Sequence, residues 1–165
     1  ILSHYDDKLG DHAHTGLRVE GEQPLGVGTL RASGFDVLVG GRRYGKGSSR
    51  EHSPAAEKLA GVRLVFAESF ERIYRQNADN IGLFTSTDFG LLAQIERGEA
   101  ITLADLVAGR EALAASVLGA GGLLRWGQRF LANVDSAAGA ASHTDTTPPR
   151  AATPCGSEPL LANGG

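Results

Sequence analysis

The chain has 165 residues, of which 41% are hydrophobic and 21% are charged, and its formal net charge is −3. This length allows one domain with a hydrophobic core and some additional tail. The slightly acidic balance gives no reason to expect nucleic acid or an acidic membrane surface as a partner. No apolar run approaches the roughly 18 residues that a membrane span needs, and no signal peptide is visible, so we expect a cytoplasmic protein.

Cysteine and methionine usage limits the metal chemistry and the origin of the chain. The single cysteine, Cys155, lies in a Pro/Thr-rich stretch and excludes an internal disulfide framework. An iron–sulfur cluster needs several thiolates and a structural zinc typically needs four ligands, so we expect any such metal to belong to another chain. The chain has no methionine, even at position 1, which indicates a processed or truncated product.

Residues 1–24 are polar and rich in turn formers. His12 and His14 are two positions apart, a spacing that would put both on one face of a strand as metal ligands. We favour a solvated loop, because the spacing supplies no third ligand, and we expect His52 to pack rather than to bind metal. Residues 15–19 suggest a short strand, and the glycine-punctuated residues 26–31 a loop.

The middle of the chain alternates strand and helix patterns. Three apolar runs predict buried strands: residues 35–41, 62–67 and 83–87. Ser53 as N-cap and Pro54 at the first helical position predict a helix that stops at Gly61. A second helix is expected to open at Ser69, to end at residues 80–82, and to bury one stripe: Phe70, Ile73, Tyr74 and Ala78. This order predicts an α/β fold with a parallel βαβ core.

The C-terminal part is helical in pattern before it loses periodicity. Residues 88–98 predict a short helix ended by glycine, residues 111–118 a helix or a strand, and residues 123–131 an amphipathic helix. The rest is mainly Ala, Gly, Thr, Pro and Ser, which is typical of a linker or disordered tail. We therefore expect one domain over residues 1–131 and a linker or disordered tail over residues 132–165.

The stretch from Gly45 to Pro54, Gly-Lys-Gly-Ser-Ser-Arg-Glu-His-Ser-Pro, concentrates the reactive groups of the chain. It follows a predicted strand and opens a predicted helix, so backbone N–H groups and the helix dipole favour an anion there. Arg50 adds a planar fork for a carboxylate, and Ser48 or Ser49 becomes a base or nucleophile if its alkoxide is stabilised. The combination suggests a di- or tricarboxylate site with a serine acting on a C–H or C–O centre.

Spacing alone leaves other interpretations of this stretch open. In the simplest one, the stretch is a tight turn without a binding function, in which Ser48 and Ser49 cap the backbone. Arg50 then makes a surface ion pair with Glu51 or Glu57. A phosphate-binding loop is disfavoured, because the lysine precedes the second glycine instead of following it.

The same stretch resembles the Gly-x-Gly-Ser-Ser-Arg-Glu-His signature of the small, swivelling domain of the aconitase family. We call residues 45–54 the signature segment. The resemblance continues through residues 61–74, Asn77 and residues 80–83, and it returns at residues 119–124. It implies a swivelling β/β/α domain similar to the isopropylmalate dehydratase small subunits, and it covers roughly residues 26–131.

The resemblance also implies an activity and its residues. The activity is that of an iron–sulfur hydro-lyase that dehydrates and rehydrates a malate-type hydroxy acid such as 3-isopropylmalate, as in leucine biosynthesis. A large partner subunit, or a fused large domain, would carry the [4Fe-4S] cluster, and this chain would bind none. Carried over to this sequence, Ser48 would be the alkoxide base that removes the C–H proton. Gly47, Ser49 and Arg50 would hold a carboxylate of the small polycarboxylate substrate.

Two departures from the family pattern affect these expectations. The usual Asp-x-x-Thr-Asp opening is missing before residues 6–10, which suggests a truncated N-terminus. The Tyr-Leu-Arg loop that selects the substrate has only a poor counterpart at residues 16–19, which leaves the substrate open. The alternative function is therefore a truncated, non-catalytic anion-binding or interaction module of the same fold.

Overall fold

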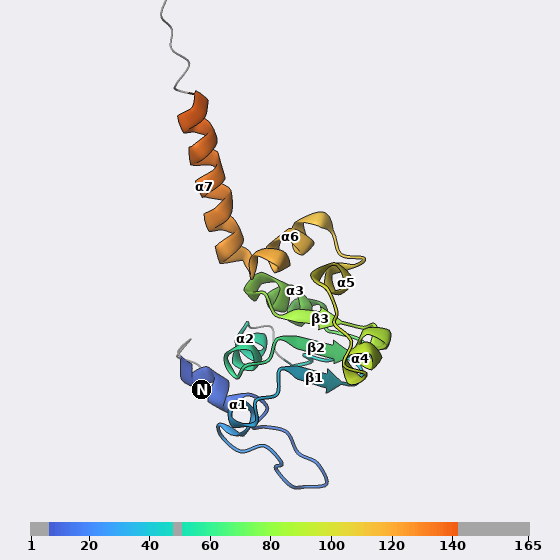
Figure 1. The fold of residues 1–165 in the computed structure, drawn as a ribbon. Coiled ribbons are helices and arrows are strands. Elements are labelled where there is room, and N and C mark those ends of the chain that lie inside the picture. The colour runs from blue at the N-terminus through green and yellow to red at the C-terminus, as the bar shows by residue number, and fades with distance from the viewer. Residues whose placement is uncertain (1–6, 48–50, 142–165) are drawn as a thin grey trace, which may run out of the picture.

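Three short parallel strands form the centre of the protein in a computed structural model that describes residues 7–47 and 51–141, with side chains up to residue 134 (Figure 1). The strands are β1 (Val37–Gly40), β2 (Leu64–Ala67) and β3 (Phe84–Ser86), in the spatial order β1-β2-β3. Val37 is aligned with Leu64, and Leu64 with Phe84. The predicted α/β fold with its parallel βαβ core is confirmed.

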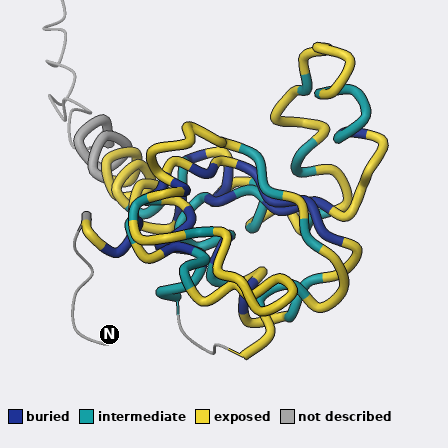
Figure 2. The backbone as a smooth tube through the Cα atoms, turned by 90° about the horizontal axis from the view of Figure 1, so that it is seen from below, coloured by how far each residue is buried: buried dark blue, intermediate teal, exposed yellow. Residues whose placement is uncertain are grey.

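Helices cover both faces of this sheet because successive side chains of the central strand point to opposite sides. Val65 packs into a cluster with the connecting helices α2 (His52–Leu59) and α3 (Arg72–Ile81). Its neighbours Leu64 and Phe66 pack against α4 (Phe89–Glu96) and α5 (Leu103–Val107) on the other side. Figure 2 shows that the buried segments gather in the middle of the molecule, where the strands lie.

The start of α2 differs from the prediction. The helix begins at His52, after Glu51, so the assignment of Ser53 as N-cap is wrong and Pro54 is the third helical residue. Proline fits there because the first N–H groups of a helix have no partner within the helix. The end of α2 is as predicted, with Gly61 at a φ of 105° after the last turn.

The start of α3 also differs, because its expected first turn pairs elsewhere. The Tyr44 N–H donates to the Ser69 carbonyl at 2.9 Å, and the Glu71 N–H donates to the Tyr44 carbonyl at 2.9 Å. Residues 69–71 thereby continue the pairing of β1 and β2, and the prediction of a helix from Ser69 is wrong. The predicted stripe is divided, since Phe70 lies before the helix and Ile73 is 43% exposed, whereas Tyr74 and Ala78 are buried.

The remaining elements are mostly short helices: the 3-10 helix η1 (Asp7–His12), α1 (Thr29–Ser33), α6 (Ala112–Ala120) and α7 (Leu123–Ala141). The loop expected at residues 26–31 is partly α1, and the strand expected at residues 15–19 is reduced to one bridge between Val19 and Glu22. Residues 111–118, for which the sequence allows a helix or a strand, are helical, with Glu111 as the N-cap of α6. Helix α7 continues beyond the predicted end at Leu131 and projects from the body (Figure 1). Residues 142–165, most of the predicted tail, lie outside the described residues.

Arg110, between α5 and α6, holds this connection against the sheet. Its side chain is 5% exposed and donates to both carboxylate oxygens of Asp79 in α3, at 2.6 Å for the first. It also donates to the carbonyl and the hydroxyl of Thr85 in β3, each at 2.7 Å. One guanidinium therefore links α3, β3 and the α5–α6 connection.

The end of α3 meets the α6–α7 turn through backbone alone. A Cβ on Gly82 would lie 2.5 Å from the carbonyl carbon of Gly121, and one on Gly122 would lie 2.8 Å from the Asn80 carbonyl oxygen. Real Cβ atoms do not approach so closely, so glycine is required on both sides of this contact. Among the residues that the structure describes, no helix has the length and apolar character needed to cross a membrane.

Candidate active site

The signature segment follows the carboxyl end of β1, the edge at which open α/β sheets commonly bind ligands. Of its predicted site residues, Gly47 is described, whereas Ser48, Ser49 and Arg50 lie outside the described residues. Their roles therefore stay predictions, and the geometry on either side of them defines the candidate site. The flanking pieces are residues 44–47 and the first turn of α2.

Two glycines shape the turn that leads into the signature, for different reasons. Gly45 has a φ of 83° and Gly47 a φ of 101°, both in the left-handed region that favours glycine. A Cβ on Gly45 would lie 2.2 Å from Cγ of Tyr74, so the tyrosine ring also excludes any side chain there. Apart from the neighbours of Gly47 in the chain, no atom of the described residues lies within 4 Å of a Cβ built on it, so the described part of the structure leaves space beside this backbone.

A positively charged hollow lies beside Gly47. Its volume is about 440 Å³, and its lining includes the three cations Arg43, Lys46 and Arg72 against the single carboxylate of Glu71. The Arg43 Nε donates to Glu71 at 2.7 Å, which leaves an excess of positive charge from the other two side chains. Such a concave surface attracts small anions with several carboxylates. We call it the basic hollow.

A buried carboxylate lies beneath the same turn. Glu57, on α2, is 2% exposed, and three side chains from other segments reach it. The Tyr44 hydroxyl donates to Oε1 at 2.8 Å, the Tyr74 hydroxyl donates to Oε2, and the His14 Nε2 lies 3.0 Å from Oε1. We call these four residues the Glu57 cluster. Glu57 is not at the surface, and Arg50 lies outside the described residues, so the alternative ion pair of Arg50 with Glu51 or Glu57 stays untested.

Burial controls the protonation of the two phenols in this cluster. Burial raises the pKa of Tyr44 and of Tyr74 far above the ordinary value, and the nearby Glu57 carboxylate raises both further. Both hydroxyls therefore stay protonated at any physiological pH and act as donors. The two rings also pack edge to face, with centroids 5.2 Å apart.

The histidine pair considered as a metal site has a different role in the fold. His14 belongs to the Glu57 cluster, and its Nε2 lies 3.1 Å from the Tyr44 hydroxyl. His12 is the exposed last residue of η1. Within residues 7–47 and 51–141, no three His, Cys, Asp or Glu side chains come together as a possible metal site.

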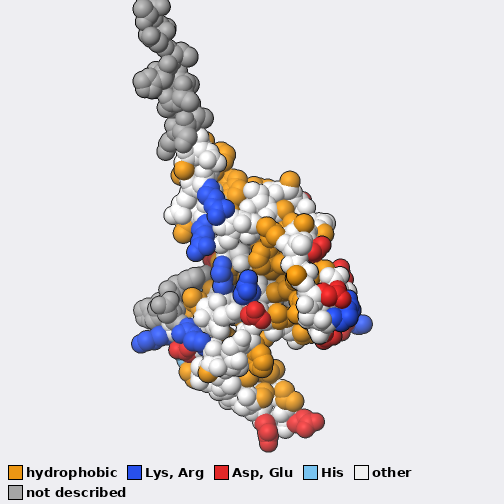
Figure 3. Space-filling view, in the orientation of Figure 1, with side chains coloured by type: hydrophobic (Ala, Val, Ile, Leu, Met, Phe, Trp, Pro, Cys, Tyr) orange, Lys and Arg blue, Asp and Glu red, His pale blue; other side chains and the backbone are white. Residues whose placement is uncertain are grey.

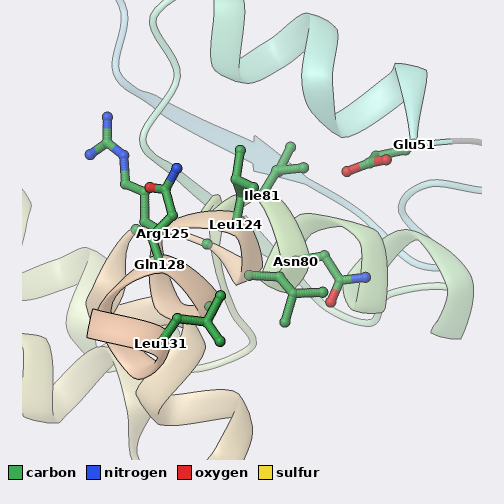
Figure 4. A pocket seen from close by; sticks show the side chains of 11 residues that line it. Glu51, Asn80, Ile81, Leu124, Arg125, Gln128 and Leu131 are labelled. Atoms are coloured by element: carbon green, nitrogen blue, oxygen red, sulfur yellow. The ribbon is translucent and has the colours of Figure 1, made fainter. Parts of the chain in front are cut away.

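A cavity of about 750 Å³ lies at the other end of the signature segment (Figure 4). Its lining is mostly apolar. Besides Glu51, the lining residues come from the end of α3, the α6–α7 turn and the start of α7: Asn80, Ile81, Gly121, Gly122, Leu123, Leu124, Arg125, Gly127, Gln128 and Leu131. The Glu51 carboxylate stands across this cavity from the α7 side chains (Figure 4). The lining suits apolar contact better than recognition of carboxylates.

Positive side chains lie next to this cavity. Burial and the charge of Arg125 lower the pKa of Lys58, whose ammonium donates to the Ile81 carbonyl. Figure 3 shows Lys and Arg side chains along α7 and on the body below it, on one face of the molecule. The two ends of the signature segment thus border different surroundings, a basic hollow at Gly47 and an apolar cavity at Glu51.

Comparisons with known proteins match the central part of the chain. The aconitase C-terminal domain family matches residues 14–87. The 3-isopropylmalate dehydratase small subunit of Aquifex aeolicus is 38% identical over 112 residues, which cover 59% of this chain and 67% of that protein. The protein of the same name from Syntrophus aciditrophicus is 44% identical over 73 residues, 44% of each chain.

Other relatives carry related names. The isopropylmalate/citramalate isomerase small subunit of Methanocaldococcus jannaschii is 45% identical over 64 residues, 39% of this chain and 38% of that protein. A crystal structure of 3-isopropylmalate dehydratase from the same organism has 28% sequence identity and a TM-score of 0.47, and the match covers 61% of this chain and 68% of that one. The chain spans less than half the length of several curated relatives that it matches, 44% for the Syntrophus protein.

Proposed function

Because the chain belongs to the aconitase family, as a relative of the 3-isopropylmalate dehydratase small subunits, we propose that it is the small subunit or domain of a hydro-lyase. The proposed reaction is the dehydration and rehydration of a malate-type hydroxy acid. The names of the relatives include isopropylmalate, citramalate and homoaconitase. We take 3-isopropylmalate, and with it leucine biosynthesis, as the first possibility to test.

The basic hollow beside Gly47 is the observation that carries this proposal. A substrate with two carboxylates would approach the open backbone at Gly47, attracted by the excess charge of Lys46 and Arg72. In the proposed mechanism Gly47, Ser49 and Arg50 bind a carboxylate. Ser48, as an alkoxide, accepts the proton from the C–H group of the substrate.

The proposed iron–sulfur cluster belongs to a partner. The described residues offer no metal site, and the single cysteine of the chain, Cys155, lies outside them. A [4Fe-4S] cluster needs several thiolates, so the donor set of this chain does not fit it. We therefore assign the cluster to a large subunit or a fused large domain, and we derive no step of the reaction through it.

Three further expectations remain proposals. One is a cytoplasmic location. The second is the division of the chain into a domain over residues 1–131 and a linker or tail over residues 132–165, a boundary that α7 crosses. The third is the alternative function, a truncated and non-catalytic anion-binding module that would use the basic hollow without chemistry.

Reconstitution with a large subunit tests the proposal. The purified chain is mixed with a cluster-loaded large subunit of a relative, and formation of the unsaturated acid from 3-isopropylmalate is followed. Ser48→Ala is expected to lower kcat by about 10²- to 10⁴-fold, the usual contribution of a general base. Ser53→Ala, in the first turn of α2, is the matched control and should keep the activity.

Two results would contradict the proposal. One is the absence of turnover with every malate-type substrate tried, and the other is full activity of the Ser48→Ala variant. Binding of a dicarboxylate to the chain without turnover in the complex would instead favour the non-catalytic module.

A further inference from the structure

Hydrogen bonds fix both the backbone and the side chain of Tyr44, the residue immediately before the signature segment. The backbone of Tyr44 exchanges hydrogen bonds with Ser69 and Glu71, and its side chain donates to Glu57. The next residue, Gly45, lies against the ring of Tyr74, which leaves no room for a Cβ. The entry to the signature segment is thus fixed in both its backbone and its side chain.

The same carboxylate belongs to helix α2, which begins within the last three residues of the signature segment. Helix α2 begins at His52, and Glu57 lies on it, one to two turns from its start. The hydrogen bond from Tyr44 to Glu57 therefore joins the residue before the signature segment to the helix in which that segment ends. The bond thereby fixes the distance between Tyr44 and α2.

Stability alone does not require a carboxylate at this place. Burying a charged group is costly even when it is hydrogen-bonded, and apolar side chains of similar volume often replace buried ionic groups without loss of stability. Glu57 is buried, as are the three residues before it in α2, Pro54, Ala55 and Ala56. An acceptor with two oxygens serves one purpose that an apolar residue cannot, which is to fix two phenols at defined positions.

We propose that Glu57 is a positioning residue that, through Tyr44 and Tyr74, fixes the Gly45–Gly47 turn and thereby aligns the signature residues for reaction. The part that concerns alignment for reaction rests on the proposed function. The part that concerns the turn can be measured on the free chain. Small displacements of catalytic groups, on the order of 1 Å, lower rates by about a hundredfold.

The test uses Tyr44→Phe, which removes one hydroxyl and keeps the ring. The Lys46 N–H donates to the Arg43 carbonyl at 3.1 Å within the turn, so hydrogen exchange at the Lys46 amide reports on the turn directly. We expect this exchange to become at least about tenfold faster in Tyr44→Phe. In the reconstituted complex, we expect kcat to fall by about ten- to a hundredfold with a much smaller change in KM.

Thr85→Val is the matched control. It removes one buried hydroxyl that accepts a hydrogen bond from Arg110. Thr85 lies in β3, away from the Gly45–Gly47 turn. Exchange at Lys46 and kcat should both stay close to those of the unchanged chain. Two further variants change Glu57 itself: Glu57→Gln keeps one carbonyl oxygen as acceptor, and Glu57→Leu keeps none. The exchange rate at Lys46 and kcat of Glu57→Gln should lie between the values of the unchanged chain and those of Glu57→Leu.

The two readouts separate the inference from the proposed function. Equal exchange at Lys46 in Tyr44→Phe and Thr85→Val would overturn the inference, and so would faster exchange with an unchanged kcat. If the unchanged chain gives no turnover in any complex, the proposed function fails. Exchange at Lys46 still decides whether Glu57 fixes the turn.

Discussion

Replacing Arg110 by methionine removes the one guanidinium that links α3, β3 and the α5–α6 connection. The variant keeps a side chain of similar length but leaves the Asp79 carboxylate, 17% exposed, without its ion-pair partner, although the charge of Arg75 still acts on it. It also leaves the hydroxyl and the carbonyl of Thr85 without this donor. Removing one partner of a buried ion pair costs about 3–5 kcal/mol, because the other charge stays buried and unpaired.

The size of the loss follows from these contacts. Because Asp79 keeps some contact with water, we expect the lower end of that range, about 3 kcal/mol. This is a large part of the 5–15 kcal/mol typical of a whole domain. For a domain of this size it corresponds to a fall in Tm of about 6–12 °C.

The loss should also depend on pH. Burial raises the pKa of Asp79, and the charge of Arg110 opposes that rise, so the pKa is expected to rise further in Arg110→Met. Between the pKa of the unfolded chain, about 3.9, and this higher folded value, the native state binds more protons than the unfolded state. Stability contributed by the protonated carboxyl is therefore present at low pH and lost as the pH rises. The deficit of the variant should be largest near neutrality and smaller toward pH about 4.

Urea denaturation followed by circular dichroism measures this deficit at both pH values. Asp79→Asn combined with Arg110→Met should recover part of the loss, because no charge remains buried. Arg97→Gln, which breaks only an exposed ion pair with Glu99, should change the free energy of unfolding by less than about 1 kcal/mol. A loss below about 1 kcal/mol in Arg110→Met, or a deficit that grows toward acid pH, would refute the reasoning.

Three other predictions concern the turn, the basic hollow and a helix cap. Gly45→Ala should destabilise the protein more than Gly47→Ala in urea denaturation. Both add about 1–2 kcal/mol of left-handed strain, but only Gly45→Ala also pushes a Cβ into a tyrosine ring. Lys46→Gln should raise KM for a dicarboxylate substrate severalfold with kcat nearly unchanged. The control Arg63→Gln should change neither constant, because Arg63 lies just before β2, at the amino ends of the strands and away from the basic hollow. Thr102→Val removes the capping box of α5 and should lower the free energy of unfolding by about 1 kcal/mol, while an unchanged urea midpoint would contradict the assigned cap.

The strands were predictable because their signal is local. A strand of a parallel sheet covered on both faces is a continuous apolar run, and each of the three runs lies close to a glycine or a turn. The helix ends at Gly61 and Gly82 were predictable for the same reason, since a left-handed residue after the last turn favours glycine.

The errors arise where distant segments decide the local structure. Residues 69–71 have a helix-start pattern, yet they pair with Tyr44, which is far away in sequence. Glu57 has the pattern of an exposed helical glutamate, because its partners Tyr44, Tyr74 and His14 come from three separate segments. The sequence predicts too short an α7, since its Ala-rich second half has no apolar periodicity.

The glycine contact between the end of α3 and the α6–α7 turn has a consequence for how this chain varies among its relatives. A Cβ on Gly82 would meet the backbone of Gly121 and Gly122, and a Cβ on Gly122 would meet the backbone of Asn80 and Ile81. A substitution at either glycine therefore has to be absorbed by a shift of the opposite segment. We expect these two segments to be inherited together. A C-terminal helix grafted from another protein should dock on α3 only if the graft brings its own glycine pair.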